Sequence, residues 1–319
     1  MSAAAKNVGA VLLLCFSLLA CEASKTPTTP AELGTSSTRS ALVTVSERPG
    51  VVEFRKWTSA RWAVPLSGLL NLKHPKAVAA GLEDREEAIE IYVYSLVHPR
   101  FGTFLVDSGV STLFLNDDGI PLIASIVASA MNMQALDVQK TTADIAAELG
   151  TIDGVFLTHI HLDHIMGLTD LPSTTPVYIG PRDTTARVPL NALTVRSTDR
   201  LLATQELLRE WDFDDSKVVD IFADGSVFAI HSPGHTPGAT AYLVHSTDGP
   251  QLLLGDATHT RWGWDNGVEP GSYSLDVPTS ASSLAWLKEL AADMPGLTEH
   301  PGHQCAVGSC AHSRSGPRT

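Results

Sequence analysis

Residues 158–164 read Thr-His-Ile-His-Leu-Asp-His, an H-x-H-x-D-H pattern that directly follows a short apolar run. It places four metal-binding side chains within six residues. His159 and His161 are two residues apart, so on an extended backbone their side chains point in the same direction. Asp163 and His164 follow in the turn, where the chain can curl around a second ion. Neutral imidazoles with a carboxylate suit zinc, and suit iron or manganese less specifically.

Three further candidate ligands lie downstream, each in a loop that contains glycine. His235 follows Ser232-Pro233-Gly234, Asp256 follows an apolar run and Gly255, and His303 ends the stretch His-Pro-Gly-His. Loops at strand ends, held by a rigid sheet, are where catalytic groups usually lie. With the first motif these side chains make a set that is large enough for two metal ions, with positions left open for water.

These motifs resemble those of the metallo-β-lactamase fold superfamily over roughly residues 90–303. The five superfamily motifs occur in order: Asp107-Ser108-Gly109, the H-x-H-x-D-H stretch, His235, Asp256 and His303. The resemblance implies an α/β fold, an αββα four-layer sandwich with two mixed sheets, helices outside and metals at one edge. Gly302 before His303 matches the superfamily pattern, and therefore His303 rather than His300 is predicted to be the ligand.

The resemblance also implies how the ligands divide and what they hold. The implied sets are His159, His161 and His235 for one ion, Asp163, His164 and His303 for the other, and Asp256 as a bridge. Two Zn2+ ions per chain are expected, with iron or manganese as alternatives. Asp107 is predicted either to fix the tautomer of a histidine or to cap the turn at Ser108 and Gly109.

A pair of zinc ions can share one hydroxide, so the sequence predicts a hydrolase that cleaves a lactone or ester with a metal-bridging hydroxide. Asp163 is also a candidate to orient that hydroxide. Alternatives are a thioesterase or phosphodiesterase on the same metals, a true β-lactamase, or a non-catalytic metal-binding lipoprotein. True β-lactamases generally lack a carboxylate at Asp256. Flavo-diiron members replace one motif histidine with a carboxylate, whereas His161 keeps the hydrolase pattern.

The order of motifs is most similar to that of the N-acyl-homoserine lactonases, with one departure. Those enzymes commonly place a tyrosine three residues after the bridging aspartate, and here that position is His259. We predict that His259 is a catalytic residue that donates a proton or a hydrogen bond; the alternative is a structural turn residue. The aromatic loop 261–273 either forms an apolar pocket for a small-molecule substrate or packs beneath the site.

The beginning of the chain predicts export. Residues 1–20 have the charge and apolar length of a signal peptide. Leu18-Leu19-Ala20-Cys21 resembles a bacterial lipobox, which predicts that Cys21 is lipidated and that the protein is anchored in the cell envelope, at the outer membrane or the periplasmic face. Ordinary secretion is the alternative. Residues 21–40 are rich in Ser, Thr, Pro and Ala and are predicted to be a flexible tether, with the hydrolase domain at 41–319.

Charge and the remaining segments give further expectations. The formal net charge is −13 and there is no basic run, which argues against a nucleic-acid partner. Cys305 and Cys310 are predicted to form a local disulfide, with an accessory metal site including His312 as the alternative. Residues 41–87 are predicted to form a cap or edge extension, or a surface strap. The sequence does not indicate the oligomeric state.

The apolar periodicity predicts the regular elements of the domain. Strands are expected at 88–97, 103–106, 154–157, 177–179, 218–222, 227–231, 240–244 and 251–254. Helices are expected at 120–131, 142–149, 201–211 and from Ser282 or Ser283 to Leu290, and Gly150 is expected to end the second of them.

Overall fold

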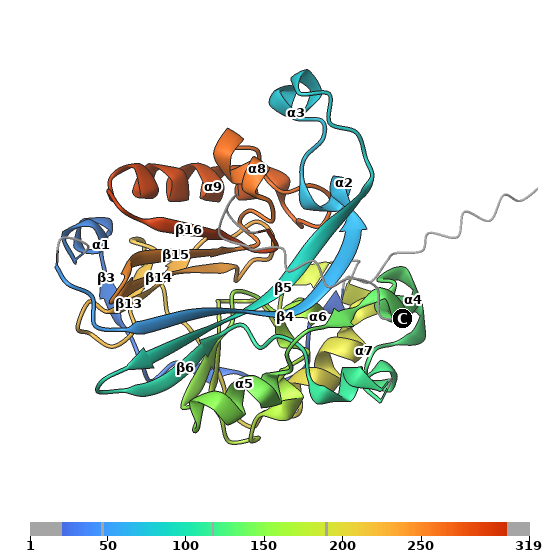
Figure 1. Ribbon diagram of the computed structural model, residues 1–319, viewed down its shortest axis with the longest axis horizontal. Helices are drawn as coiled ribbons and strands as arrows, with labels where there is room; N and C mark the ends of the chain where they lie inside the picture. Colours follow the sequence, from blue (N-terminus) through green and yellow to red (C-terminus); the bar gives the residue numbers. More distant parts are fainter. Residues whose placement is uncertain (1–20, 46–47, 117, 189–190, 305–319) are drawn as a thin grey trace, which may run out of the picture.

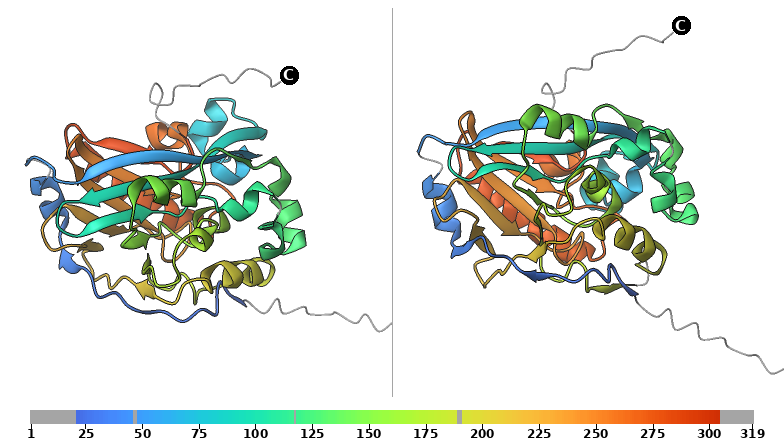
Figure 2. Two further views of the ribbon diagram at one scale, coloured as in Figure 1. Left: turned by 60° about the horizontal axis from the view of Figure 1, so that its bottom comes forward. Right: turned by 90° about the horizontal axis from the view of Figure 1, so that it is seen from below.

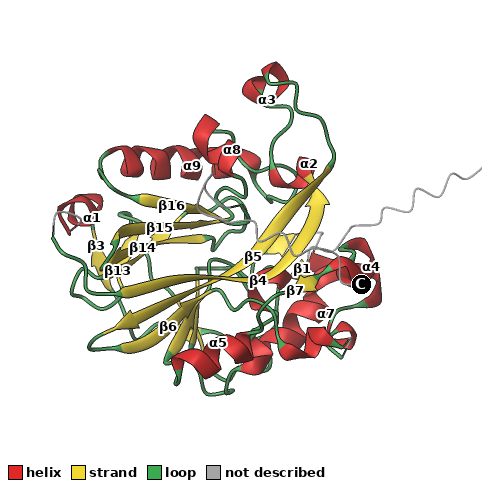
Figure 3. Ribbon diagram, in the orientation of Figure 1, coloured by secondary structure: helices red, strands yellow, loops and turns green. Residues whose placement is uncertain are grey.

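Two β-sheets lie face to face in the computed structural model, and helices cover their outer sides (Figure 1, Figure 3). The structure describes residues 21–45, 48–116, 118–188 and 191–304. The predicted signal peptide and the pair Cys305 and Cys310 lie outside these residues, as does His312. Within the described ranges, no helix has both the length and the apolar character needed to cross a membrane.

The larger sheet contains both parallel and antiparallel pairs. Its order among the described residues is β2 (Thr29–Pro30), β11 (Leu208–Glu210), β9 (Val177–Ile179), β8 (Gly154–Phe156), β6 (Gly102–Val106), β5 (Glu86–His98), β4 (Glu53–Pro65) and β7 (Asp137–Val138). β6, β8, β9, β11 and β2 are parallel, whereas β4, β5 and β6 pair antiparallel.

The smaller sheet is mostly antiparallel. Its order is β16 (Thr298–Pro301), β15 (Gly249–Gly255), β14 (Thr240–Ser246), β13 (Val227–His231), β12 (Val218–Asp220) and β3 (Thr35–Ser37). β16 joins β15 in parallel. A separate pair is formed by β1 (Cys21–Glu22) and β10 (Arg187–Val188).

Three apolar clusters show why the layers hold together. The cluster between the sheets contains Tyr92 and Phe156 from one sheet and Tyr242 and Leu253 from the other. The other two clusters lie between each sheet and its helices. The helices are α1 (Arg39–Val45), α2 (Leu66–Leu69), α3 (Pro75–Ala79), α4 (Ser125–Ala130), α5 (Thr142–Leu149), α6 (Leu162–Ile165), α7 (Asn191–Leu202), α8 (Arg261–Asn266) and α9 (Val277–Ala292). The αββα prediction is therefore confirmed.

Local sequence explains several predicted elements. Helix α5 has the predicted bounds, because Thr141 and Asp144 form a capping box and Gly150 follows with φ +86°. The last helix starts earlier than predicted, because the Asp276 side chain accepts from the N–H of Thr279. The predicted helix at 120–131 is shortened to a 3₁₀ turn (Ile120–Leu122) and α4, because the N–H of Ala124 donates to Ser197 instead.

The helix predicted at 201–211 is wrong. Helix α7 ends at Leu202, and the chain then enters strand β11. Leu208 pairs with Val177 of β9, so strand pairing determines the conformation of these residues. The apolar residues from 201 to 211 belong to two elements, and a helical period read across both was misleading.

The prediction of a flexible tether at 21–40 is also wrong. This segment runs along the edges of the sheets and supplies β1, β2 and β3 (Figure 2). Ala31 and Leu33 pack against the cluster between the sheets. Gly34 has φ +101°, and a Cβ there would lie 2.5 Å from Val219. Backbone pairing with exposed strand edges orders a segment that has too few apolar side chains to fold alone.

Residues 41–87 contain a strand that periodicity did not reveal. Strand β4 pairs along the length of β5 and buries Trp57 and Trp62. The alternation along β4 breaks where a β-bulge between Thr58 and Ala60 shifts the register, so that Trp57 and Trp62 are both buried although they are an odd number of residues apart. The connection between the two strands carries α2 and α3 and lies beside α8 (Figure 1), where Lys76 Nζ donates to the carbonyl of Asn266.

Candidate metal centre

All seven predicted ligands lie at one end of the sandwich, in loops that follow strands. The H-x-H-x-D-H stretch starts after β8 and its second half forms the single turn α6. His235 lies between β13 and β14, Asp256 directly follows β15, and His303 is two residues beyond the end of β16. The strands that deliver these residues belong to different sheets, so the centre lies at an edge shared by both sheets.

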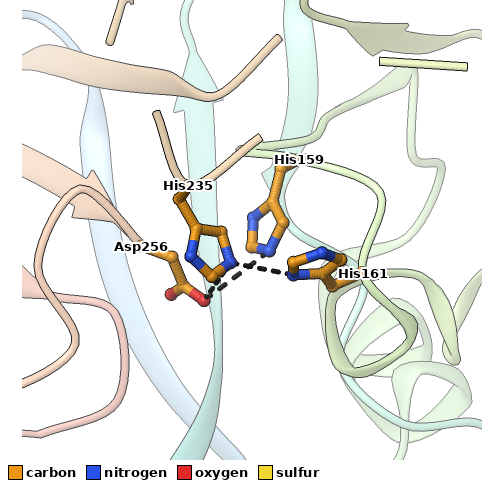
Figure 4. A group of neighbouring side chains, drawn as sticks. All are labelled: His159, His161, His235 and Asp256. Atoms are coloured by element: carbon orange, nitrogen blue, oxygen red, sulfur yellow. Dashed lines mark hydrogen bonds and ion pairs between the residues drawn. The ribbon is translucent and has the colours of Figure 1, made fainter. Parts of the chain in front are cut away.

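The first cluster brings together His159, His161, His235 and Asp256 (Figure 4). One potential ligand atom from each lies within 4.8 Å of the others. His235 Nε2 is 2.8 Å from His161 Nδ1 and 3.2 Å from Asp256 Oδ2. These are the side chains predicted for the first ion, together with the predicted bridge.

The second cluster contains Asp163, His164 and His303, again with ligand atoms within 4.8 Å of one another. Asp163 Oδ2 lies 3.5 Å from Nε2 of each of the two histidines. Asp256 touches this cluster as well, because its Oδ1 is 3.2 Å from His303 Nε2 and its Oδ2 is 3.7 Å from His164 Nε2. Asp256 therefore lies between the two groups, where a bridging ligand is expected.

The arrangement fits metal ions on chemical grounds. Donors that share an ion at about 2.0–2.2 Å lie roughly 3–3.5 Å apart, close to the separations seen here. Among the described residues, the buried Nε2 atoms of His159, His164 and His259 have no hydrogen-bond partner, and neither has Asp256 Oδ1. Buried polar atoms are rarely left without one. Imidazoles with carboxylates are the ligand set of zinc, with iron and manganese as less specific alternatives.

The pKa shifts of the residues in the first cluster favour the binding of a cation. Burial lowers the pKa of His159, His161 and His235, so these imidazoles keep their lone pairs at neutral pH. Burial alone would raise the pKa of Asp256, but the surrounding imidazoles, His259 foremost, hold that pKa well below its usual value. The bridge is consequently ionised.

The second cluster differs in its proton content. Burial opposes charging of His164, but Asp107, Asp163 and Asp256 outweigh it and hold the pKa of His164 well above its usual value. The pKa of His303 is raised as well, because Asp256 and Asp163 outweigh the effect of burial. In the metal-free protein these two imidazoles therefore stay protonated on both nitrogens up to a higher pH than a free imidazole does. A cation that binds to them must displace a proton.

This difference predicts that zinc binding to the second cluster releases protons, whereas binding to the first releases few. Lowering the pH should consequently weaken the second site first, since raised pKa values let protons compete at higher pH. Calorimetric zinc titrations in buffers of different ionisation enthalpy measure the released protons for each step. Equal release at both steps would contradict the assignment.

The outer nitrogens of the ligands are held by residues that surround the centre. Asp107 takes the first of its two predicted roles, because its Oδ2 is 2.9 Å from His164 Nδ1 while it also accepts from the N–H of Thr158. His303 Nδ1 is 3.1 Å from the carbonyl oxygen of Glu90, and His235 Nδ1 is 3.2 Å from Ser274 Oγ. Such contacts fix the tautomer and orientation of a ligating imidazole.

The remaining predicted residues are placed as follows. His259 is buried in the centre, with its Nε2 3.1 Å from Asp256 Oδ2. His300 is not part of either cluster and contacts Gln251 instead, 2.8 Å away. In the aromatic loop, Trp264 packs beneath the surface against the cluster that includes α9. Tyr273 remains partly exposed, and its ring centroid is 6.5 Å from that of His259.

Asp183 is a buried residue of the site that sequence reasoning missed. It accepts a hydrogen bond from the N–H of Gly238 at 2.9 Å, beyond His235 in the same loop. It also accepts from the N–H of Ile160, between the first two ligands, but burial outweighs these bonds and raises the pKa of Asp183 to about 6. This carboxyl connects the two loops that carry the three histidines of the first cluster. A lone aspartate in a loop gives no signal of such a role.

The raised pKa of Asp183 predicts a pH dependence of stability. Because the folded-state pKa exceeds the unfolded one, the contribution of this group is fully present below about pH 4 and is lost as the pH rises through about 6, by about 3 kcal/mol. The free energy of unfolding of metal-free wild type should therefore fall relative to that of Asp183→Asn across this window. Denaturant unfolding at several pH values measures the difference, and parallel profiles would refute it.

Comparison with known proteins places the chain in a family. The family model of the metallo-β-lactamase superfamily matches residues 94–303. The chain therefore belongs to the metallo-β-lactamase superfamily, and the predicted family is confirmed.

Two individual relatives within this superfamily are similar in sequence to parts of the chain. N-acyl homoserine lactonase AttM of Azorhizobium caulinodans is 31% identical over 154 residues, covering 47% of this chain and 57% of the relative. Gamma-lactamase MBL2 of Gibberella moniliformis is 28% identical over 152 residues, covering 43% and 63%. The matches thus span less than two thirds of these relatives.

Solved structures agree on the fold. A quorum-quenching N-acyl homoserine lactone lactonase superposes with a TM-score of 0.57 at 15% identity, covering 80% of this chain and 94% of that one. A probable metal-dependent hydrolase from Staphylococcus aureus gives a TM-score of 0.60, also at 15% identity, covering 80% and 90%.

Proposed function

We propose that this protein is a dinuclear zinc hydrolase that opens a small-molecule lactone or cleaves a simple ester. The observation that carries the proposal is Asp256, which lies between two clusters that each offer ligands for one ion. Bound in this way, two zinc ions act as Lewis acids and make water nucleophilic near neutral pH. The similarity to N-acyl homoserine lactonases supports a lactone as the substrate.

The exposure of the ligands indicates how a substrate approaches. Of the seven, only His161 and Asp163 are partly exposed, and the other five are buried. The carbonyl to be attacked therefore reaches the centre on the side of these two residues. Asp163 is placed to accept a hydrogen bond from the attacking water and to orient it.

Tyr273 is the exposed aromatic residue beside the centre, with its ring centroid 6.5 Å from that of the buried His259. Burial raises the pKa of the Tyr273 phenol, and the negative charge of Asp163 raises it further, so the phenol stays neutral and can donate a hydrogen bond. We propose that this O–H donates to the ring or carbonyl oxygen of the substrate. Its position outside the ligand clusters leaves it available for that contact.

A second candidate is hydrolysis of a γ-lactam, which the two fungal gamma-lactamase relatives support at 28% and 29% identity. The substrates of the two candidate reactions differ in one ring atom. A lactam nitrogen is a poorer leaving group than a lactone oxygen, so it needs protonation as the bond breaks.

One experiment tests both candidates. The purified, zinc-loaded protein is assayed with matched five-membered lactones and lactams that carry the same acyl chains, and with a β-lactam, a thioester and a phosphodiester. We expect turnover of the lactones, and we expect Asp163→Ala to lose it. If no compound is hydrolysed, or if the variant is as active as wild type, the proposed function is wrong.

We also propose that the protein is anchored to the bacterial envelope through lipidated Cys21, which the lipobox-like sequence supports. Cys21 lies in β1, directly paired with Val188 of β10, so acyl chains on it would hold this edge of the domain close to the membrane. Globomycin, which blocks lipoprotein signal cleavage, should make the larger precursor accumulate in cells. An unchanged size would remove the proposal.

A further inference from the structure

The buried ring of His259 points one nitrogen toward the metal centre. Its side chain is 1% exposed, and its Nδ1 is 2.9 Å from the carbonyl oxygen of Leu69. A carbonyl oxygen can only accept, so Nδ1 carries a proton and donates it. The other nitrogen, Nε2, lies 3.1 Å from Asp256 Oδ2. A proton on Nε2 would form a hydrogen bond directed at this oxygen, whereas a lone pair on Nε2 could bind a cation next to both atoms.

The contact with Asp256 does not have the geometry of a hydrogen bond. Despite the short distance, Nε2 of His259 has no hydrogen-bond partner among the residues that the structure describes. The nitrogen is therefore directed beside the carboxylate oxygen rather than along the line to it. Two atoms that both bind a third, a cation, have this relation to each other.

Three histidines of the two clusters have the same arrangement. In each of them, Nδ1 contacts an outer partner while Nε2 lies 3.2–3.7 Å from an oxygen of Asp256. These histidines and their partners are His164 with Asp107, His235 with Ser274, and His303 with Glu90. His259 with Leu69 repeats this pattern, at the shortest of these distances to Asp256.

We propose that His259 is an eighth metal ligand, binding through Nε2 on the His235 side of the centre. The side is assigned because the ring centroid of His259 lies 4.9 Å from that of His235 and 5.7 Å from that of His303. The proposal rests on the dinuclear zinc centre proposed above. It replaces the expectation that His259 donates a proton to the substrate, since a nitrogen that binds a cation has no proton to donate.

The connection between β4 and β5, which carries α2 and α3, then has a role in positioning a metal ligand. Leu69 is in α2, and its carbonyl fixes the orientation of the His259 ring. The same helix packs against the loop after α8, where a Cβ on Gly68 would lie 2.2 Å from the Tyr273 ring. The segment from 66 to 85 is thus connected to the metal centre through one imidazole.

Two substitutions separate metal binding from a structural role. Asparagine places its amide nitrogen near the position of imidazole Nδ1, so His259→Asn keeps the donation to Leu69 and removes the inner donor. Glutamine places its amide near Nε2, so His259→Gln keeps an oxygen donor to the cation and removes the bond to Leu69. His300→Gln is the matched control, because that partly buried histidine contacts Gln251 away from the centre.

The readouts are zinc affinity in competition with a coloured chelator and the absorption spectrum of the Co2+-substituted protein. We expect His259→Asn to weaken binding of one ion by roughly 10–100-fold and to change the Co2+ spectrum. His259→Gln should retain more affinity than His259→Asn, and His300→Gln should match wild type. Thermal unfolding of the metal-free proteins confirms that each variant is folded.

Two outcomes would overturn the proposal. If His259→Asn binds both ions as wild type does and only His259→Gln is impaired, the ring has a structural role through Leu69. If His259→Asn keeps full affinity and an unchanged spectrum but loses lactone turnover, the ring contacts the substrate instead. Wild-type protein that binds two ions without hydrolysing any tested substrate would refute the proposed reaction and leave the ligand assignment standing.

Discussion

Replacing Asp256 with alanine is expected to abolish the binding of two zinc ions and to lower hydrolysis by about a thousandfold. The carboxylate touches both clusters, so its loss removes a shared ligand from each ion. It also removes a buried negative charge that would offset the mutual repulsion of two cations held in the two clusters. One zinc per chain or less should remain after dialysis, measured by elemental analysis together with the rate on the best lactone.

The control for this variant is Asp215→Ala, which removes one carboxylate from an exposed turn before β12. It should keep the wild-type zinc content and rate. Full zinc occupancy in Asp256→Ala would show that the two clusters bind their ions independently, and the bridging role of Asp256 would have to be abandoned.

Replacing Gly302 with alanine is expected to have the second-largest effect, although this residue binds nothing itself. A Cβ at this position would lie 2.3 Å from Asp256 Oδ1 and 2.8 Å from the carbonyl oxygen of Gly255. The added methyl group must displace the carboxylate or the His303 loop by about an ångström. Displacements of that size at a reacting centre cost about a hundredfold in rate, and the overpacking costs about 1–3 kcal/mol in the free energy of unfolding.

Zinc affinity, the rate of lactone opening and denaturant unfolding check this prediction. Gln304→Ala is a matched control in the same loop, since that side chain donates to Glu87. A Gly302→Ala protein with wild-type zinc affinity and rate would show that the loop yields without moving Asp256. The close approach also gives a physical reason for the glycine before His303, which the superfamily pattern predicts without explaining.

The metal centre was predictable because its chemistry resides in side chains. Imidazoles and carboxylates at strand ends are visible as residue types, and the structure brings all seven together. The outer partners were not predictable, because Glu90 and Leu69 act through their backbone carbonyls, which every residue has. The role of Asp107 was predicted only as one of two alternatives, because a carboxylate before a turn can either fix a histidine tautomer or cap the turn.

The fold was predictable where an apolar run belonged to one element. Helix α5 and strands β5 to β9 follow the periodicity, except for the two-residue strand β7. Strand β4 was missed because a β-bulge between Thr58 and Ala60 shifts the alternation of buried and exposed residues within it. The segment 21–40 was misjudged because its order comes from backbone pairing with strand edges far away in the sequence, and composition does not report such pairing.

The most direct test of the account is anomalous X-ray diffraction from crystals of the zinc-loaded protein, recorded at the zinc absorption edge. We expect two peaks of comparable height on either side of the Asp256 carboxylate, one among His159, His161 and His235 and the other among Asp163, His164 and His303. A single peak away from Asp256, or none after zinc loading, would contradict the existence of a dinuclear centre in this protein.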